Sequence, residues 1–304
     1  MGILDDLLTI DADNAARWQE NLGKFDHALP PLMNSAAEMY HTFAHCMTGV
    51  FDESTARDVD CIRRRAVQLG LSEEEMKQRL SSDRYDPVQD SDARGAHLQL
   101  QSRMARVIIF MLLRRQYDWG ATDLLRMRLT PADGYRRLQA ESIGLLLTIQ
   151  AEPAVGDRWL RIRTLGEGQR FFRGKQARIK EAIRAADLEF IYDHGSAVAQ
   201  HVRLQSAVLG LSFGDAQAAL AYQEVREDDP FSYFLSVVSY LSTQVKIFHV
   251  LAKAFPEMQD PIWPGRVQRF GQDVGRLWKT LEEKFPEQRQ EIVEWERRRD
   301  RGPS

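Results

Sequence analysis

Helical periodicity runs through almost the whole chain of 304 residues, and no stretch shows the sustained alternation of a half-buried strand. Start signals divide the pattern into separate helices. Ser72 precedes three glutamates, which makes a capping box, and Thr130 stands before Pro131, which suits the first position of a helix. The sequence therefore predicts an all-α protein folded as a multi-helix bundle.

The organisation of this bundle is marked by one loop and one ambiguous stretch. Pro87 and several Asp and Ser predict a loop over 84–92. A boundary near 83–91 would separate an N-terminal helical segment, 1–83, from a main bundle, 91–300; the two could also pack as one domain. Residues 207–225 fit a short hairpin, an irregular connection or a helix. Helices are expected over 11–22, 31–51, 54–69, 91–117, 131–152, 153–164, 171–191, 193–204, 230–254 and 264–284, with Gly166 and Gly168 interrupting the chain.

Composition points to a soluble protein of the cytoplasm. Hydrophobic residues make up 43% and charged residues 28% of the chain, which is ordinary for a globular domain. Two cysteines, Cys46 and Cys61, are too few for a disulfide framework, and the N-terminus lacks a signal-peptide pattern. The apolar stretch 233–252 carries polar side chains, so a core helix is favoured over a membrane span. We expect no membrane contact, and the sequence does not fix the oligomeric state.

The densest run of chemically capable side chains lies between Tyr192 and His201. In a continuous helix His194 and His201 are seven residues apart and share one face, and Asp187 lies seven residues earlier on the same face. This face is where we expect the protein to act.

A second motif lies on the helix that ends before Pro153. Glu141 stands among leucines there, and a buried carboxylate needs a partner; Arg137 is one helical turn away, and His194 or His201 would be another. We expect these groups to form one polar cluster, which is either a ligand site or a network that fixes helix register. Its members are Arg137, Glu141, Tyr192, His194, Ser196 and His201.

These two motifs together resemble an uncharacterised family of bacterial helical proteins. That family has an Arg-x3-Glu helix ending in proline, followed by a helix with Tyr and Ser-x4-His, and the resemblance covers about residues 120–255. It implies a helical fold and the same residue set, without an established activity.

The leading functional hypothesis is a binding or interaction protein, with enzymatic activity left open. Arg137 would clamp an anionic group while the two histidines donate hydrogen bonds to it. Residues 103–184 hold 17 Lys plus Arg against 8 Asp plus Glu, which would attract a small anionic molecule or an acidic protein partner. The basic residues nearest to this cluster in the sequence are Arg158, Arg161, Arg163, Arg170 and Arg173.

An alternative hypothesis is a metalloenzyme with iron, manganese or zinc. Glu38 and His45 are seven residues apart, and carboxylate and imidazole suit these metals. The set resembles the ligand pattern of heme-oxygenase-like di-metal oxidases, although Val198 stands where that family carries a carboxylate. The resemblance implies five ligands: Glu38, His45, Glu141, His194 and His201.

A third hypothesis is RNA binding through the arginine-rich middle, which would weaken steeply with salt. The sequence carries no recognition module for nucleic acid. Aromatic stacking platforms usually lie on strands, so the tryptophans are expected to anchor helix packing instead. These are tryptophans 119, 159, 263, 278 and 295.

Overall fold

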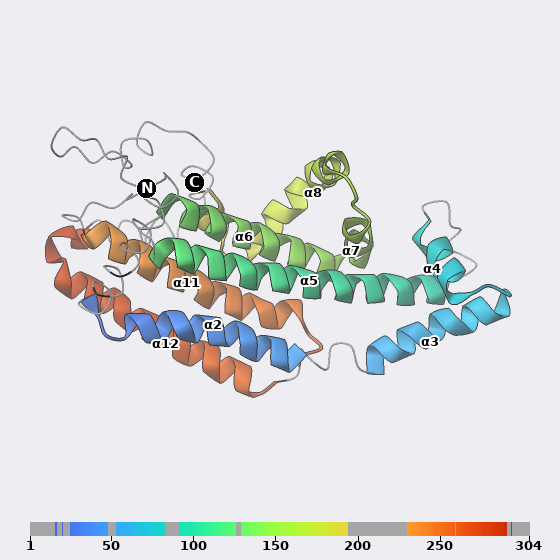
Figure 1. Ribbon diagram of the computed structural model, residues 1–304, viewed down its shortest axis with the longest axis horizontal. Coiled ribbons are helices and arrows are strands. Elements are labelled where there is room, and N and C mark those ends of the chain that lie inside the picture. Colours follow the sequence, from blue (N-terminus) through green and yellow to red (C-terminus); the bar gives the residue numbers. More distant parts are fainter. Residues whose placement is uncertain are drawn as a thin grey trace, which may run out of the picture.

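The protein is described by a computed structural model over residues 16, 20, 25–47, 53–82, 91–125, 129–193, 230–258, 260–290 and 293. Within these ranges the chain folds into helices without a strand, which confirms the predicted all-α multi-helix bundle (Figure 1). The ambiguous stretch 207–225 lies outside them. The elements are α2 (Leu29–Cys46), α3 (Glu53–Gln68), α4 (Glu73–Ser81), α5 (Ser91–Leu125), α6 (Leu129–Ala151), α7 (Pro153–Leu160), α8 (Leu165–Ala185), α11 (Pro230–Ala254), α12 (Ile262–Lys284) and the 3-10 turn η2 (Pro286–Gln288).

Helix α5 is the spine of the molecule. Its 35 residues extend about 52 Å, much farther than the predicted helix over 91–117. Helices α2, α6 and α11 lie beside its C-terminal part, α12 packs against α2 and α11, and α3 and α4 lie at its N-terminal end (Figure 1). One continuous helix therefore joins two packed regions.

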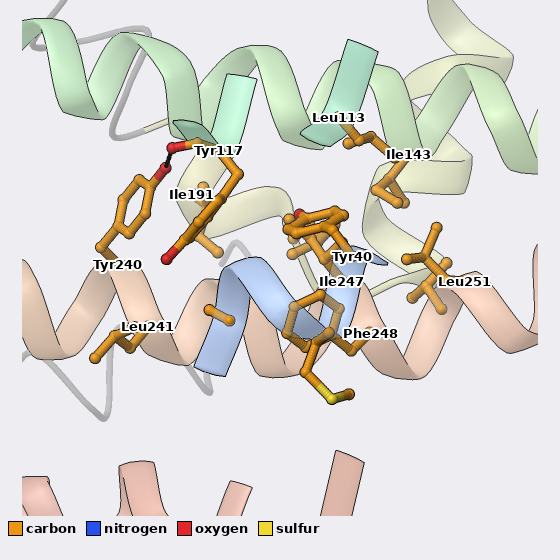
Figure 2. Close-up of a cluster of buried hydrophobic side chains, with 14 of the residues drawn as sticks. Tyr40, Leu113, Tyr117, Ile143, Ile191, Tyr240, Leu241, Ile247, Phe248 and Leu251 are labelled. Atoms are coloured by element: carbon orange, nitrogen blue, oxygen red, sulfur yellow. Dashed lines mark hydrogen bonds between the residues drawn. The ribbon is translucent and has the colours of Figure 1, made fainter. Parts of the chain in front are cut away.

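Aromatic side chains fill the centre of the main region (Figure 2). The ring of Tyr40 on α2 lies 5.4 Å from that of Tyr117 on α5 and 5.0 Å from that of Phe248 on α11. The hydroxyl of Tyr240 donates to the carbonyl of Tyr117 at 2.9 Å. Gly120 makes this contact possible, because a Cβ atom there would lie 2.4 Å from the Tyr240 oxygen.

Two glutamines form a buried polar network inside this aromatic core. The hydroxyl of Tyr40 donates to Gln244 Oε1 at 2.7 Å, and Gln244 Nε2 donates to Gln139 Oε1 at 3.0 Å. All three side chains are fully buried. Each of these side chains forms a hydrogen bond to another helix, so the network specifies how α2, α6 and α11 meet.

Arg136 forms a second buried network between α6 and α11. Its guanidinium donates to Ser239 Oγ at 2.8 Å and to Thr243 Oγ1 at 3.2 Å, and it pairs with Asp133 at 2.9 Å. This network could not be predicted from the sequence, because helical periodicity does not show which helices face each other.

A smaller apolar cluster joins α3, α4 and the start of α5. It contains Ile62, Met76 and Leu80, whereas the side chains of α2 belong to the main core. The predicted boundary near 83–91 falls between α4 and α5, and residues 83–90 lie outside the described ranges. In the described residues, the chain therefore passes between the two cores at two places. One is along α5, and the other is between α2 and α3.

The predicted interruption at Gly166 and Gly168 is wrong. Both glycines lie in the first turn of α8, which begins at a capping box: Thr164 accepts from the backbone of Glu167, and the Glu167 carboxylate accepts from the backbone of Thr164. Two satisfied backbone N–H groups outweigh the low helix propensity of glycine at this end. For the same reason α4 begins after Ser72 as predicted.

The predicted continuous helix over 171–191 is also wrong. The chain turns at Asp187, whose φ of 56° lies in the left-handed region, and the N–H of Leu188 donates to the carbonyl of Ile183 at 3.0 Å. This hydrogen bond spans five residues and is typical of a helix end with a left-handed residue, a position that Asp tolerates better than most residues. Asp187 therefore does not share a helical stripe with residues that follow the turn.

Helix α11 is the one helix of the described residues that has the length and apolar composition to cross a membrane. Inside the bundle, 67% of its most apolar stretch is buried. Its bounds, Pro230–Ala254, are those predicted from the sequence.

Candidate functional site

A pocket of about 550 Å³ lies between α6 and α8. Three of the residues that the sequence assigned to one polar cluster line it together: Arg137 and Glu141 from α6, and Tyr192 from the short helical turn after α8. The remaining wall comes from α8. The pocket is open on one side and carries more apolar than polar surface.

Gly144 determines how closely α6 and α8 cross below this pocket. A Cβ atom at this position would lie 2.6 Å from Cγ1 of Ile183 and 2.8 Å from the carbonyl oxygen of Ile179. No side chain fits there without movement, so the helices touch at Gly144. The pocket lies on the N-terminal side of this contact along α6, where Arg137 and Glu141 stand.

Arg137 and Glu141 form the ion pair that their spacing predicts. Nη2 of Arg137 donates to Oε1 of Glu141 at 2.8 Å, and the Arg137 side chain is only 12% exposed. Nε of Arg137 is buried and has no hydrogen-bond partner among the described residues. A buried N–H group without a partner is costly, so this guanidinium has capacity to bind a further acceptor.

Tyr192 covers the same guanidinium. The central carbon of Arg137 lies 5.2 Å from the centre of the Tyr192 ring, and Nζ of Lys180 lies 5.7 Å from it. Both distances suit attraction between a cation and the face of an aromatic ring. Tyr192 thus gathers two positive charges at one end of the pocket.

The carboxyl group of Glu141 is affected by two opposing influences. Partial burial raises its pKa above the ordinary value, and the charge and hydrogen bond of Arg137 act in the other direction without cancelling the increase. Glu141 therefore loses its proton less readily than a carboxyl group in water. When it is protonated, its attraction for Arg137 weakens.

The apolar wall of the pocket was not identified from the sequence. Phe172, Ile179 and Ile183 on α8 line it, together with Leu165, which is 81% exposed. Their spacing could have indicated this apolar wall, because residues 172, 179 and 183 repeat on one face of a helix that is otherwise strongly charged. Arg173, which the sequence placed in the basic zone, also lines the pocket.

Three members of the predicted cluster, His194, Ser196 and His201, lie outside the described residues. The expected alignment of the two histidines with Asp187 assumed a continuous helix, and the turn at Asp187 removes that assumption. Instead, the Asp187 carboxylate pairs with Lys246 of α11.

Of the five residues expected to bind a metal, two lie on α2, one lies on α6 and two lie outside the described ranges. Glu38 and His45 are exposed on α2, and Glu141 pairs with Arg137 on α6. Within the described ranges, no three His, Cys, Asp or Glu side chains lie close enough together to hold a metal ion. His194 and His201 are not among those ranges.

Much of the positive charge over 103–184 is neutralised by nearby carboxylates. Arg158, Arg163 and Arg170 are exposed, but other basic side chains are paired, including some that tie one helix to the next. The described basic side chains over 103–184 therefore do not act together as one surface of unpaired positive charge. The ion pairs are Arg103–Asp58, Arg106–Glu257, Arg136–Asp133, Arg161–Asp157, Lys175–Glu152, Arg178–Glu152 and Arg184–Glu189.

A buried cluster at the junction of α4, α5 and α7 was not identified from the sequence. Nε2 of His97 lies 3.1 Å from Oγ of Ser81 and 3.5 Å from Oδ1 of Asp157. Burial alone would raise the pKa of Asp157, but the hydrogen bond from His97 and the charge of Arg161 lower it. Hydroxyl and carboxylate share one ring nitrogen, so this is not the arrangement of a serine hydrolase, in which they use different nitrogens.

The chain matches no protein family model, no curated protein and no solved structure. The resemblance to the family of bacterial helical proteins therefore stays a prediction, and the functional argument depends on the pocket itself.

Proposed function

We propose that this protein binds a small amphipathic anion, such as a carboxylate with an apolar tail, in the pocket between α6 and α8. One observation carries the proposal: Arg137, Glu141 and Tyr192, chosen from the sequence for their chemistry, line a single pocket. Its volume of about 550 Å³ lies within the range of small-molecule sites.

The lining suits a ligand with two unlike ends. Phe172, Ile179 and Ile183 offer apolar surface for a hydrocarbon tail, which would gain free energy by leaving water. The guanidinium of Arg137 brings one positive charge to the pocket lining, and Arg173 brings a second. The anionic group would therefore lie near Arg137 and Tyr192, with the tail along α8.

Glu141 competes with the ligand for Arg137. A bound anion would take over part of the role of the Glu141 carboxylate, so binding favours the protonated form of Glu141. Because its pKa is already raised by partial burial, affinity is expected to increase as the pH falls toward that pKa, provided the ligand itself remains ionised. Glu141→Gln should increase affinity and remove this pH dependence.

The test is thermal stabilisation by straight-chain carboxylates of increasing length, from butanoate to decanoate, each compared with the alcohol of the same length. A ligand that binds the folded state raises Tm. We expect longer carboxylates to raise Tm more than the alcohols do. Arg137→Gln should abolish this difference, whereas Arg170→Gln, which alters an exposed arginine of α8 outside the pocket lining, should retain it.

Two results would contradict the proposal. One is a folded Arg137→Gln variant that responds to the carboxylates as the parent protein does. The other is an equal response to the carboxylates and the alcohols, which would show that the pocket does not select charge.

A further inference from the structure

Exposed apolar side chains gather on one face of α5, and none of them lines the pocket between α6 and α8. Met104, Ile108, Met111 and Leu112 are 42%, 37%, 63% and 41% exposed. Trp119 continues the same face at 45% exposure, and its ring lies 5.7 Å from that of Tyr135 on α6, so it also contributes to the contact between these helices. We call these five residues the α5 stripe. A row of large apolar residues in water is unusual on a surface that serves no partner.

A groove of about 530 Å³ runs along the edge of the α5 stripe. Ala44 of α2 and Met47, the residue that follows α2, form one wall, and Val107, Phe110 and Met111 of α5 form the other. Its lining is mostly apolar. Met111 belongs to both features, so the groove and the α5 stripe make one continuous surface.

The shape of this surface fits a helix. The α5 stripe extends over sixteen residues from Met104 to Trp119, a rise of about 22 Å along the axis of α5. A partner helix of four turns has the same length and can place one apolar face in the groove between α2 and α5. Flexible methionine side chains adapt to different partner side chains.

The positive charges at the groove favour a partner helix that carries acidic side chains. Arg114 and Arg115 line it; Arg114 donates to Nε2 of His41 at 2.9 Å, and the guanidinium of Arg115 lies 4.7 Å from the centre of the Trp119 ring. Neither arginine forms an ion pair with a described carboxylate, and Asp118 is the one acidic residue of the groove lining. The two guanidinium groups are therefore available to an acidic partner.

We propose that the surface formed by the α5 stripe and the groove beside α2 docks an amphipathic helix of a partner protein, with glutamate or aspartate flanking its apolar face. A second copy of this chain fits less well, because a two-fold contact would bring two pairs of like-charged arginines together. A concave groove between two helices also suits a cylinder better than the plane of a lipid bilayer.

The probe is a fluorescent 16-residue synthetic peptide with leucine on one helical face and glutamate on its flanks, and its binding is followed by fluorescence anisotropy. We expect saturable binding that a matched peptide with lysine in place of glutamate does not show. Met111→Asp should weaken binding at least tenfold, because it removes apolar contact and repels glutamate. Val67→Asp makes the same change at an exposed apolar position of α3 and should leave binding unaltered.

Charge reversal sharpens this test. The double variant Arg114→Glu and Arg115→Glu should bind the lysine peptide more tightly than the glutamate peptide. The proposal is overturned if both peptides bind the parent protein equally, if Met111→Asp binds like Val67→Asp, or if neither peptide binds. It is also overturned if the parent protein forms a dimer that Met111→Asp dissociates, or if vesicles of anionic lipid bind and both peptides do not.

Discussion

Two neighbouring arginines of α6 illustrate two different uses of the same side chain. Arg136 points into the bundle, is 5% exposed, and bonds to Asp133, Ser239 and Thr243. Arg137 points toward α8, bonds to Glu141, and leaves Nε without a partner among the described residues beside an open pocket. Successive residues of a helix differ by about 100° in direction, so neighbours reach unlike surroundings.

This comparison separates a structural network from a candidate site. Around Arg136, Ser239 and Thr243 turn their hydroxyl groups toward the guanidinium across the contact between α6 and α11. Around Arg137, a donor remains unused, the partner carboxylate has a raised pKa, and space is left for a ligand. We therefore expect changes at the first group to cost stability, and changes at the second to cost binding.

The largest effect is expected from Arg136→Ala. The substitution removes the charge that pairs with Asp133 and the bonds to two hydroxyl groups inside the bundle, which should lower the free energy of unfolding by about 3 kcal/mol. Chemical denaturation measures this loss. Arg137→Ala is the matched variant, and its cost should stay below about 1 kcal/mol because its partner is partly exposed. Equal costs would contradict the distinction between the two arginines.

A slightly smaller loss is expected from Gln244→Leu. It leaves the hydroxyl of Tyr40 and the amide oxygen of Gln139 without their main partners in the core, at a cost of about 2 kcal/mol. Gln176→Leu changes an exposed glutamine of the pocket wall and should alter stability by less than about 0.5 kcal/mol. A core variant as stable as the pocket variant would show that the glutamine network does not hold the helices in register.

Gly144→Ala is expected to change both the stability of the bundle and the binding of carboxylates. Its new methyl group would overlap Ile183 and the backbone of Ile179, at a cost of about 1 to 3 kcal/mol, while alanine regains about 1 kcal/mol of helix propensity. A net loss of about 1 kcal/mol is expected, together with loss of carboxylate binding because α8 must move. Thermal denaturation with and without decanoate measures both quantities. Unchanged binding would contradict the role of this close contact in shaping the pocket.

The smallest effect is a pH dependence at Glu141. Its raised pKa means that the folded state holds the proton more strongly than the unfolded chain, whose ordinary pKa is 4.5. Stability from this group is therefore present at low pH and decreases as the pH rises through its folded pKa. Glu141→Gln should gain stability relative to the parent protein over that interval, by less than about 1 kcal/mol because water screens the group. If the stabilities of the parent protein and of Glu141→Gln changed with pH in parallel, this result would contradict the raised pKa of Glu141.

Local signals in the sequence predicted much of the fold. The capping box at Ser72, the bounds of α11 and the ion pair between Arg137 and Glu141 all depend on residues within a few positions of each other. The capping box of Thr164 and Glu167 is equally local, but the predicted interruption depends on Gly166 and Gly168 alone and does not include it. Such errors arise where two local effects oppose each other.

Contacts between distant helices could not be predicted in the same way. Gln139 meets Gln244 across 105 positions, and nothing in either segment indicates the other. For the same reason, the sequence suggested the polar end of the pocket but not its apolar wall, since Phe172 faces α6 only because Gly144 allows α8 to approach. Pairing between helices is a property of the packed bundle rather than of any segment.

The most direct test of the proposed site is NMR of isoleucine methyl groups during titration with decanoate. Ile179 and Ile183 line the pocket, and their signals can be assigned by valine substitution. We predict saturable shifts of these two signals, with the buried core residues Ile109 and Ile247 unaffected, and no shifts in Arg137→Gln. Binding that leaves Ile179 and Ile183 unchanged, or that persists in Arg137→Gln, would contradict the account.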